Sequence, residues 1–235
     1  MLLRSLTKHV KDQNWFAVGI DFFIVVVGVF VGLQVQNWNE KRSIKTEEAR
    51  LVAQLTINID DARISKKNWI QSTDQKIILL STAIDFIQNA PEQAVLSEEH
   101  CAAAWSSHII IWQHSKLTTF EEILLTGGLR ILSNIQLREA LMTFQSEQEI
   151  ILGFVSYVAQ DYINVVDQYP DIFTRKLNLA DDTNVVICNL KAIRENRAFQ
   201  NNLVSNLGRT RGLVGNAKLE LVLLDNIKDK LKTAQ

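Results

Sequence analysis

The stretch WFAVGIDFFIVVVGVFVGLQVQNW, from Trp15 to Trp38, decides the fold. Its residues 22–33 contain no polar side chain. In a helix, which rises about 1.5 Å per residue, the two tryptophans lie roughly 35 Å apart, slightly more than the hydrocarbon thickness of a bilayer. Because tryptophan favours both membrane–water interfaces, we predict a transmembrane helix over residues 15–38 with Trp15 and Trp38 as its interface anchors.

Two other interpretations of this stretch have to be weighed. It could be a buried helix of a soluble protein, since Asp21, Gln34 and Gln36 dilute its apolar character. It could also be a cleaved signal peptide, because residues 1–14 form a short basic tail. No small-x-small cleavage site follows it, so we interpret it as an uncleaved signal anchor. No later stretch is long and apolar enough for a second span.

Basic residues flank both ends of the predicted span and leave its orientation open. They are Arg4, Lys8 and Lys11 before it and Lys41, Arg42, Lys45 and Arg50 after it. The positive-inside rule does not separate these two groups. We expect an anchor in the inner membrane of a bacterial cell, with the N-terminus in the cytoplasm and the helical domain in the periplasm. Cys101 and Cys188 are compatible with one disulfide in an oxidising compartment and equally with two buried thiols.

Four polar or small residues of the predicted span share one helical face. Asp21, Gly28, Gly32 and Gln36 follow one another at steps of seven, four and four residues. Gly28 and Gly32 form the G-x-x-x-G pattern that lets two helices approach closely in lipid. An acidic side chain in a membrane is costly and usually faces a protein partner or water, although Asp21 could also reach back to the interface. We therefore predict a packing face for a second copy of the chain or for another membrane protein.

A polar signature follows the glycine pair where the span ends. It consists of Leu33, Gln34, Asn37, Trp38, Asn39 and Glu40. Together with Asp21 and Gly28, this signature resembles the N-terminal block of an uncharacterised bacterial family of single-span, membrane-anchored helical proteins with a domain of unknown function. That family more usually has glutamate at the position of Asp21. A second, less specific similarity lies within residues 120–141. The resemblance implies a membrane anchor joined to a helical domain, and it implies no activity.

Helical periodicity continues after the span. Residues 39–90 contain no proline or glycine, and most of their apolar residues recur at steps of three, four and seven. Lys66 and Thr73 are polar gaps in this pattern. We predict one long amphipathic helix that leaves the membrane and ends before Pro91.

Similar patterns predict a helical bundle domain over residues 91–235, packed against residues 39–90. The expected helices are 98–113, one from 118 to the Gly127–Gly128 pair, one from Asn134 toward Pro170 with a polar gap at Gln148, and 195–231. We expect a capping box at Thr118 or Thr119 and an irregular connection over 171–189. With only 2 Pro and 9 Gly in 235 residues, an all-β fold is disfavoured. The predicted class is all-α: one N-terminal transmembrane helix that continues into a bundle of long antiparallel helices.

Composition and motifs argue against several functions. The 25 basic and 26 acidic residues give a net charge of −1, which argues against a nucleic-acid partner. His100, Cys101, His108 and His114 are the best candidate metal ligands, but on one helix His100 and His108 lie about 12 Å apart, too far to share an ion. The patterns H-E-x-x-H, C-x-x-C and G-x-S-x-G do not occur. We expect no catalytic residue, no metal and no cofactor.

The leading hypothesis is a membrane-anchored helical interaction or scaffold protein. It would sit in a lipid bilayer and form a homo-oligomer or bind a membrane protein through the Asp21, Gly28 and Gly32 face. The apolar run 109–112 would offer a second binding surface or would be buried on all sides. The alternative is a sensory ectodomain that binds a small ligand and signals through a partner. A membrane-anchored hydrolase or metalloenzyme is the third hypothesis.

Overall fold

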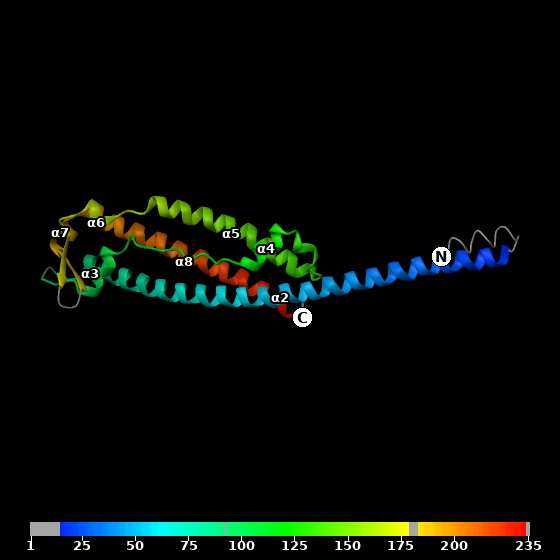
Figure 1. The fold of residues 1–235 in the computed structure, drawn as a ribbon. Coiled ribbons are helices and arrows are strands. Elements are labelled where there is room, and N and C mark those ends of the chain that lie inside the picture. The colour runs from blue at the N-terminus through cyan, green and yellow to red at the C-terminus, as the bar shows by residue number, and fades with distance from the viewer. Residues whose placement is uncertain (1–14, 92, 179–182, 234–235) are drawn as a thin grey trace. The chain divides into compact units, whose positions relative to one another are not determined.

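The computed structural model describes residues 15–91, 93–178 and 183–233, and the predicted basic tail 1–14 lies outside them. The chain divides into two compact units, residues 1–51 and 52–235. Helix α2, from Trp15 to Asn89, begins in the first unit and ends in the second (Figure 1).

In the first unit, α2 exposes its apolar side chains. An 18-residue window of this helix near the N-terminus has a mean hydropathy of 2.4, and none of the window is buried by the described residues. A helix that is apolar all round belongs either in a protein core or in a membrane, and a core helix would be mostly buried. By length and composition, α2 can cross a membrane, and it is the one such helix among the residues described.

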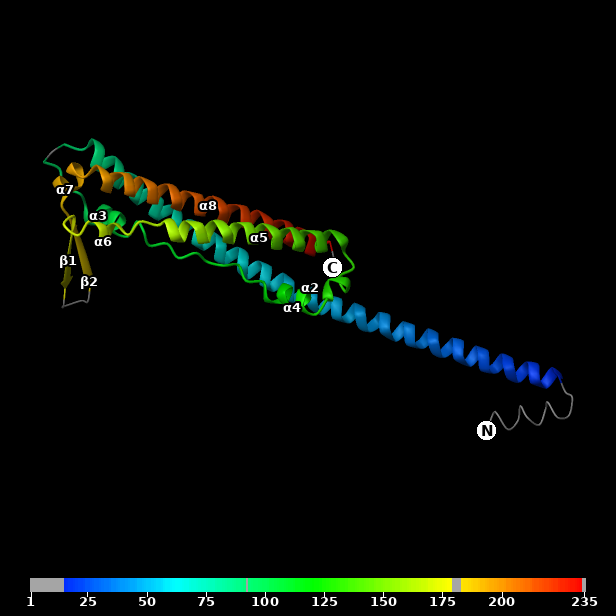
Figure 2. The ribbon, with the colours of Figure 1, turned by 90° about the horizontal axis from the view of Figure 1, so that it is seen from above.

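The second unit is a helical bundle with one small sheet. Its further elements are α3 (Glu98–Trp105), α4 (Thr118–Leu125), the 3-10 turn η1 (Gly128–Arg130), α5 (Ile135–Asp161), α6 (Val165–Gln168), β1 (Phe173–Asn178), β2 (Thr183–Cys188), α7 (Leu190–Glu195) and α8 (Arg197–Lys232). The ribbon shows α5 and α8 alongside the second-unit part of α2 in both views (Figures 1 and 2). The predicted all-α class is confirmed.

Helix α8 runs antiparallel to α2. The guanidinium of Arg63 pairs with the carboxylate of Asp225, close to the C-terminal end of α8. Further along α2, the hydroxyl of Ser81 accepts a hydrogen bond from Arg211, which lies earlier in α8, at 3.0 Å. Along the contact between the two helices, the residue numbers therefore rise in α2 and fall in α8.

Helix α5 is also antiparallel to α8. Its N-cap Asn134 accepts from the backbone N–H of Leu137 at 3.0 Å and lies beside the carbonyl of Lys230, near the end of α8. At the other end of α5, the carboxylate of Asp161 pairs with Arg209 in the first half of α8. Helices α2 and α5 therefore run in the same direction, and the chain has to return between them.

The apolar stripes predicted for α5 and α8 are the buried faces of these helices. The buried members are Leu137, Leu141, Phe144, Ile151 and Val158 in α5 and Phe199, Leu203, Leu207, Val214, Ala217, Leu224, Ile227 and Leu231 in α8. Each large aliphatic or aromatic side chain removed from water in this way stabilises the fold by roughly 1.5–3 kcal/mol. The period of 3.6 residues therefore identifies which face of each helix meets the core.

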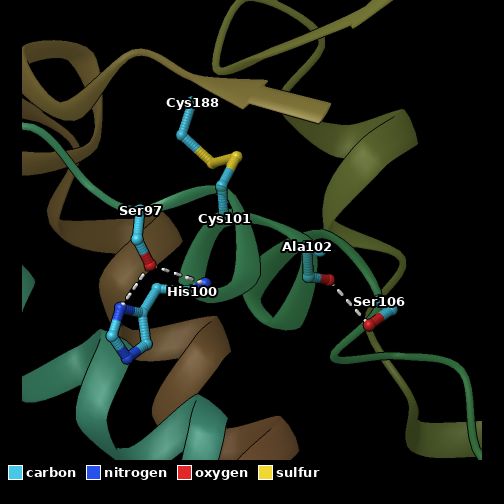
Figure 3. Close-up of a disulfide and its surroundings, with 6 residues drawn as sticks. All are labelled: Ser97, His100, Cys101, Ala102, Ser106 and Cys188. Carbon is cyan, nitrogen blue, oxygen red and sulfur yellow. Dashed lines mark hydrogen bonds between the residues drawn. A yellow bond between two sulfur atoms is a disulfide. The ribbon is translucent and has the colours of Figure 1, made fainter. Parts of the chain in front are cut away.

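The helix predicted over residues 98–113 is wrong in its second half. Helix α3 ends at Trp105, and the side chain of Ser106 donates to the carbonyl of Ala102 at 2.7 Å where the helix stops (Figure 3). Residues 109–117 are not helical. Three consecutive isoleucines, at 109–111, lose side-chain freedom in a helix, which favours an extended backbone here.

The irregular connection predicted over residues 171–189 is also wrong. Strands β1 and β2 pair there as an antiparallel hairpin, with Phe173 opposite Cys188. The β-branched residues at 185–187 suit a strand. Cys101 of α3 and Cys188 of β2 form a disulfide with a Cα–Cα distance of 5.6 Å (Figure 3), so the alternative of two buried thiols is excluded.

The helix expected to run toward Pro170 is shorter than predicted. Helix α5 ends at Asp161, because Tyr162 has an extended backbone with φ −65° and ψ 131°. Asn164 then starts the short helix α6 by accepting from the backbone N–H of Val166 at 3.1 Å. The apolar pattern predicts one helix here, but Asn164 caps the start of a second helix and so divides the segment into α5 and α6.

Candidate functional site: the spanning face and the bundle interior

The predicted packing face lies on α2 in the first unit. Asp21, Gly28, Gly32 and Gln36 are all helical there, so their spacing places them on one face. A methyl group added at Gly28 or at Gly32 would have no atom within 4 Å. Asp21 is half-buried, and its Oδ2 has no hydrogen-bond partner among the described residues. No contact within the described chain therefore accounts for these two glycines.

The signature residues continue along the same helix. Leu33, Gln34, Asn37, Trp38, Asn39 and Glu40 are all exposed. The ring of Trp38 lies 5.8 Å from the guanidinium carbon of Arg42. Trp15 is the first residue of α2, and the placement of its side chain lies outside the described part of the structure. The two predicted interface anchors thus lie on one continuous helix, and their depth in a bilayer stays a prediction.

In the second unit, the extended segment 109–117 runs along the helices and needs partners for its backbone. Every second carbonyl in its middle accepts a hydrogen bond from a helix side chain. Ile111 O accepts from Trp69 Nε1 at 2.8 Å, Gln113 O from Lys66 Nζ, and Ser115 O from Gln148 Nε2 at 2.9 Å. These side chains therefore supply the hydrogen bonds that a strand ladder or a helix would otherwise give to the backbone carbonyls.

Lys66 is the centre of this arrangement. Its side chain is 1% exposed and its Nζ lies 2.8 Å from Oε2 of Glu220, whose side chain is 2% exposed. The same ammonium lies 4.3 Å from the ring centroid of Trp112, a cation–π distance. Burial lowers the pKa of Lys66, and the carboxylate of Glu220 partly offsets this effect. One ammonium group thus joins α2, α8 and the extended segment.

The sequence carried a signal for one member of this pair. Lys66 interrupts the apolar pattern of its helix, and a long charged side chain on a buried face needs a partner. Glu220 was not predicted, although it also lies on the buried face of its helix, three residues after Ala217 and four before Leu224. A lysine on the apolar face of one helix and a glutamate on the apolar face of another form the pattern that would have indicated the ion pair between Lys66 and Glu220.

The capping box predicted at Thr118 or Thr119 is wrong. The N-cap of α4 is Leu117, which has no side-chain capping bond. Instead, Oδ1 of Asn58 on α2 accepts from the backbone N–H of Thr119 at 3.0 Å and from the hydroxyl of Thr118 at 3.1 Å. The start of α4 is therefore capped by a neighbouring helix, an interaction that a local motif cannot reveal.

The histidine and cysteine residues weighed as metal ligands do not converge. Both ring nitrogens of His100 have partners: Nδ1 lies 2.7 Å from Oγ of Ser97, and Nε2 lies 3.0 Å from Oγ1 of Thr82 (Figure 3 shows the first). Cys101 is in the disulfide. Burial lowers the pKa of His108, against the opposing effect of nearby Asp167. Within the described ranges, no three His, Cys, Asp or Glu side chains are grouped closely enough to hold a metal ion.

A mostly apolar cavity of about 350 Å³ opens between α2, α3, α8 and the residues that follow α3. Its wall includes the side chains of Ile77, Leu80, Ala103 and Ile110, and two exposed charged residues, Lys76 and Glu99. Buried Thr210 also lines it, and its hydroxyl is already paired with the hydroxyl of Tyr162 at 3.0 Å. The cavity can therefore accept an apolar group, with charges at its edge.

We expect Glu220→Leu to lower the free energy of unfolding by about 3–5 kcal/mol, because it leaves the buried ammonium of Lys66 without its counter-ion. The double variant Lys66→Met/Glu220→Leu should be less destabilised than Glu220→Leu alone, since no charge then remains buried. Urea unfolding of the full chain in detergent micelles, followed by circular dichroism, measures both effects.

The exposed pair Lys191–Glu195, 3.9 Å apart, provides the control. Glu195→Leu should change the free energy of unfolding by less than about 1 kcal/mol, because exposed ion pairs contribute little. A double variant at 66 and 220 that is less stable than Glu220→Leu would contradict the proposed role of the uncompensated charge.

Comparisons of the chain with protein-family models, with curated proteins and with solved structures found no match. The resemblance to an uncharacterised family of membrane-anchored helical proteins therefore rests on the residues of the signature alone and stays a prediction.

Proposed function

We propose that this protein is a membrane-anchored helical interaction protein. Residues 15–38 hold it in a lipid bilayer, where it forms a homo-oligomer or binds another membrane protein. One observation supports the proposal most directly. Among the described residues, a long apolar stretch of α2 is not covered by other parts of the chain, and it includes a glycine pair that has no contact there. In lipid, close helix contacts at small residues are a common means of association.

Asp21 adds to the argument for a partner in the membrane. A carboxylate at this depth is costly unless it meets a polar group or water. It shares its helical face with Gly28 and Gly32, so a helix that packs on the glycines passes close to it. The same face therefore offers close packing and a polar contact.

We expect Gly28→Ile and Gly32→Ile to weaken association by at least tenfold, because a large side chain at either position separates the two helices. Asp21→Leu should weaken association through loss of the polar contact. Analytical ultracentrifugation or energy transfer between labelled chains in bilayers measures the change.

Gly19→Ile is the matched control. It places the same side chain on the opposite face of the helix, since 19 and 28 are nine residues, or about 180°, apart. This variant should associate like the wild type. Equal association in all of the variants would show that the Gly28 face is not used.

The disulfide supports an orientation for the anchor. Disulfides form and persist in oxidising compartments such as the bacterial periplasm and are rare in the cytosol. The pair Cys101–Cys188 lies in the second unit, which follows the proposed span in the sequence. We therefore place the helical domain in the periplasm of a bacterial cell and the N-terminus in the cytoplasm, with the anchor in the inner membrane.

In this orientation, the two cysteines should resist alkylation in cells. After denaturation, the full chain should gain mass from a maleimide polymer only once a reductant has been added. Alkaline phosphatase fused after Gln235 should be active, and a fusion after residue 14 should be inactive, because the enzyme requires an oxidising compartment. Two reactive thiols together with an inactive C-terminal fusion would reverse the assigned orientation.

The cavity favours a second candidate function, a sensory ectodomain that binds a small ligand. Its apolar wall and its charged edge, with Lys76 and Glu99, suit a small amphipathic molecule.

For this candidate, a metabolite panel should contain a compound that raises the melting temperature of the wild type. Ala103→Leu, which fills the cavity, should abolish that shift. Ala192→Leu serves as the control, because it enlarges a partly buried alanine that does not line the cavity. A shift that survives Ala103→Leu would place the ligand elsewhere.

A further inference from the structure

Three basic residues and a tryptophan share one face of α2 just after the apolar stretch. Trp38, Lys41, Arg42 and Lys45 follow one another at steps of three, one and three residues, which places them within about 100° around the helix axis. All four are exposed. This set is the Trp38 basic face.

Acidic residues of this stretch lie away from the Trp38 basic face. Glu40 and Glu47 project from the opposite side of the helix, and Glu48 lies at its border. The carboxylate of Glu47 is paired with Arg50 at 2.6 Å. Lys41, Arg42 and Lys45 have no carboxylate within 4.0 Å among the described residues. The stretch is close to neutral in sum, yet one face of it is cationic.

One of the three cations, Arg42, contacts the ring of Trp38 directly. Its guanidinium lies over the ring of Trp38 at 5.8 Å, a cation–π contact that orders both side chains. Tryptophan favours the headgroup level of a bilayer. The three cations follow Trp38 within about 10 Å along the axis, which places their flexible ends at the depth of the lipid phosphates.

We propose that the Trp38 basic face binds the phosphate groups of anionic phospholipids, and so selects phosphatidylglycerol over phosphatidylcholine around the anchor. This inference rests on the proposed membrane anchoring. Neutral headgroups offer the same phosphate but cancel its charge with an ammonium group, so three cations without a carboxylate partner among the described residues favour a lipid with net negative charge. Each cation should contribute up to about fivefold in selectivity at low salt.

The test uses the full chain in phosphatidylcholine vesicles that contain a minor share of one brominated lipid. Bromine quenches tryptophan fluorescence at short range, so the quenching reports which lipid lies beside the span. In the wild type, brominated phosphatidylglycerol should quench more strongly than brominated phosphatidylcholine at the same share. Added salt should reduce the difference, because it screens exposed charges.

The variant Lys41→Gln/Arg42→Gln/Lys45→Gln should quench equally with the two lipids. The charge-matched control Lys67→Gln/Lys176→Gln/Lys191→Gln removes three exposed cations from the second unit and should keep the wild-type difference. Equal quenching by both lipids in the wild type, or a difference that the first variant retains, would overturn the lipid selectivity.

Insertion is measured separately, as resistance to alkaline extraction from vesicles of phosphatidylcholine alone. If the protein inserts but shows no lipid selectivity, the proposed anchoring stands and only the proposal about the Trp38 basic face is overturned. Failure of the wild type to insert overturns the proposed anchoring, and the lipid inference with it.

Discussion

The buried ammonium group of Lys66 is the contact on which the bundle interior depends. An extended segment outside a sheet has no backbone ladder, so its carbonyls need other hydrogen-bond partners. Lys66 binds one of these carbonyls, at Gln113, and balances its own charge with Glu220 of another helix. Trp69 and Gln148 satisfy the carbonyls on either side. The segment is therefore held by side chains of two helices, and Lys66 couples it to a third.

This arrangement explains the direction of the long helices. Helices α2 and α5 both run antiparallel to α8, so they are parallel to each other, and a parallel pair needs a long return connection between its members. The extended segment forms the middle of that connection, between α3 and α4, and Asn58 of α2 caps α4. At the other end of the bundle, the disulfide between Cys101 and Cys188 fastens α3 to the hairpin, which the ribbon shows next to α6 and α7 (Figures 1 and 2).

Sequence periodicity predicted the features that residues within one helix determine. It missed the features that contacts between distant parts of the chain determine. The long apolar stretch of α2, the buried faces of α5 and α8 and the helix start at Asn134 were all predictable, because spacing or a local capping residue determines them. The end of α3, the hairpin and the cap at α4 were not, because partners distant in the sequence decide them. In the sequence, Lys66 is recognisable only as a polar interruption of the apolar pattern. Its ion-pair partner Glu220 lies 154 residues later in the chain, so the sequence pattern around Lys66 does not reveal the contact.

The bundle and the long apolar stretch of α2 differ in how their irregular residues are explained. Within the bundle, the polar gaps at Lys66 and Gln148 are explained by partners in the same chain. Gly212 is likewise explained, since a methyl group there would meet the ring of Phe154 at 3.1 Å. In the apolar stretch of α2, Gly28 and Gly32 have no such neighbour in the described chain. Since the polar gaps and Gly212 of the bundle all serve contacts, we expect Gly28 and Gly32 to serve contacts as well. In a bilayer, the available neighbours of an apolar helix are lipids and other helices.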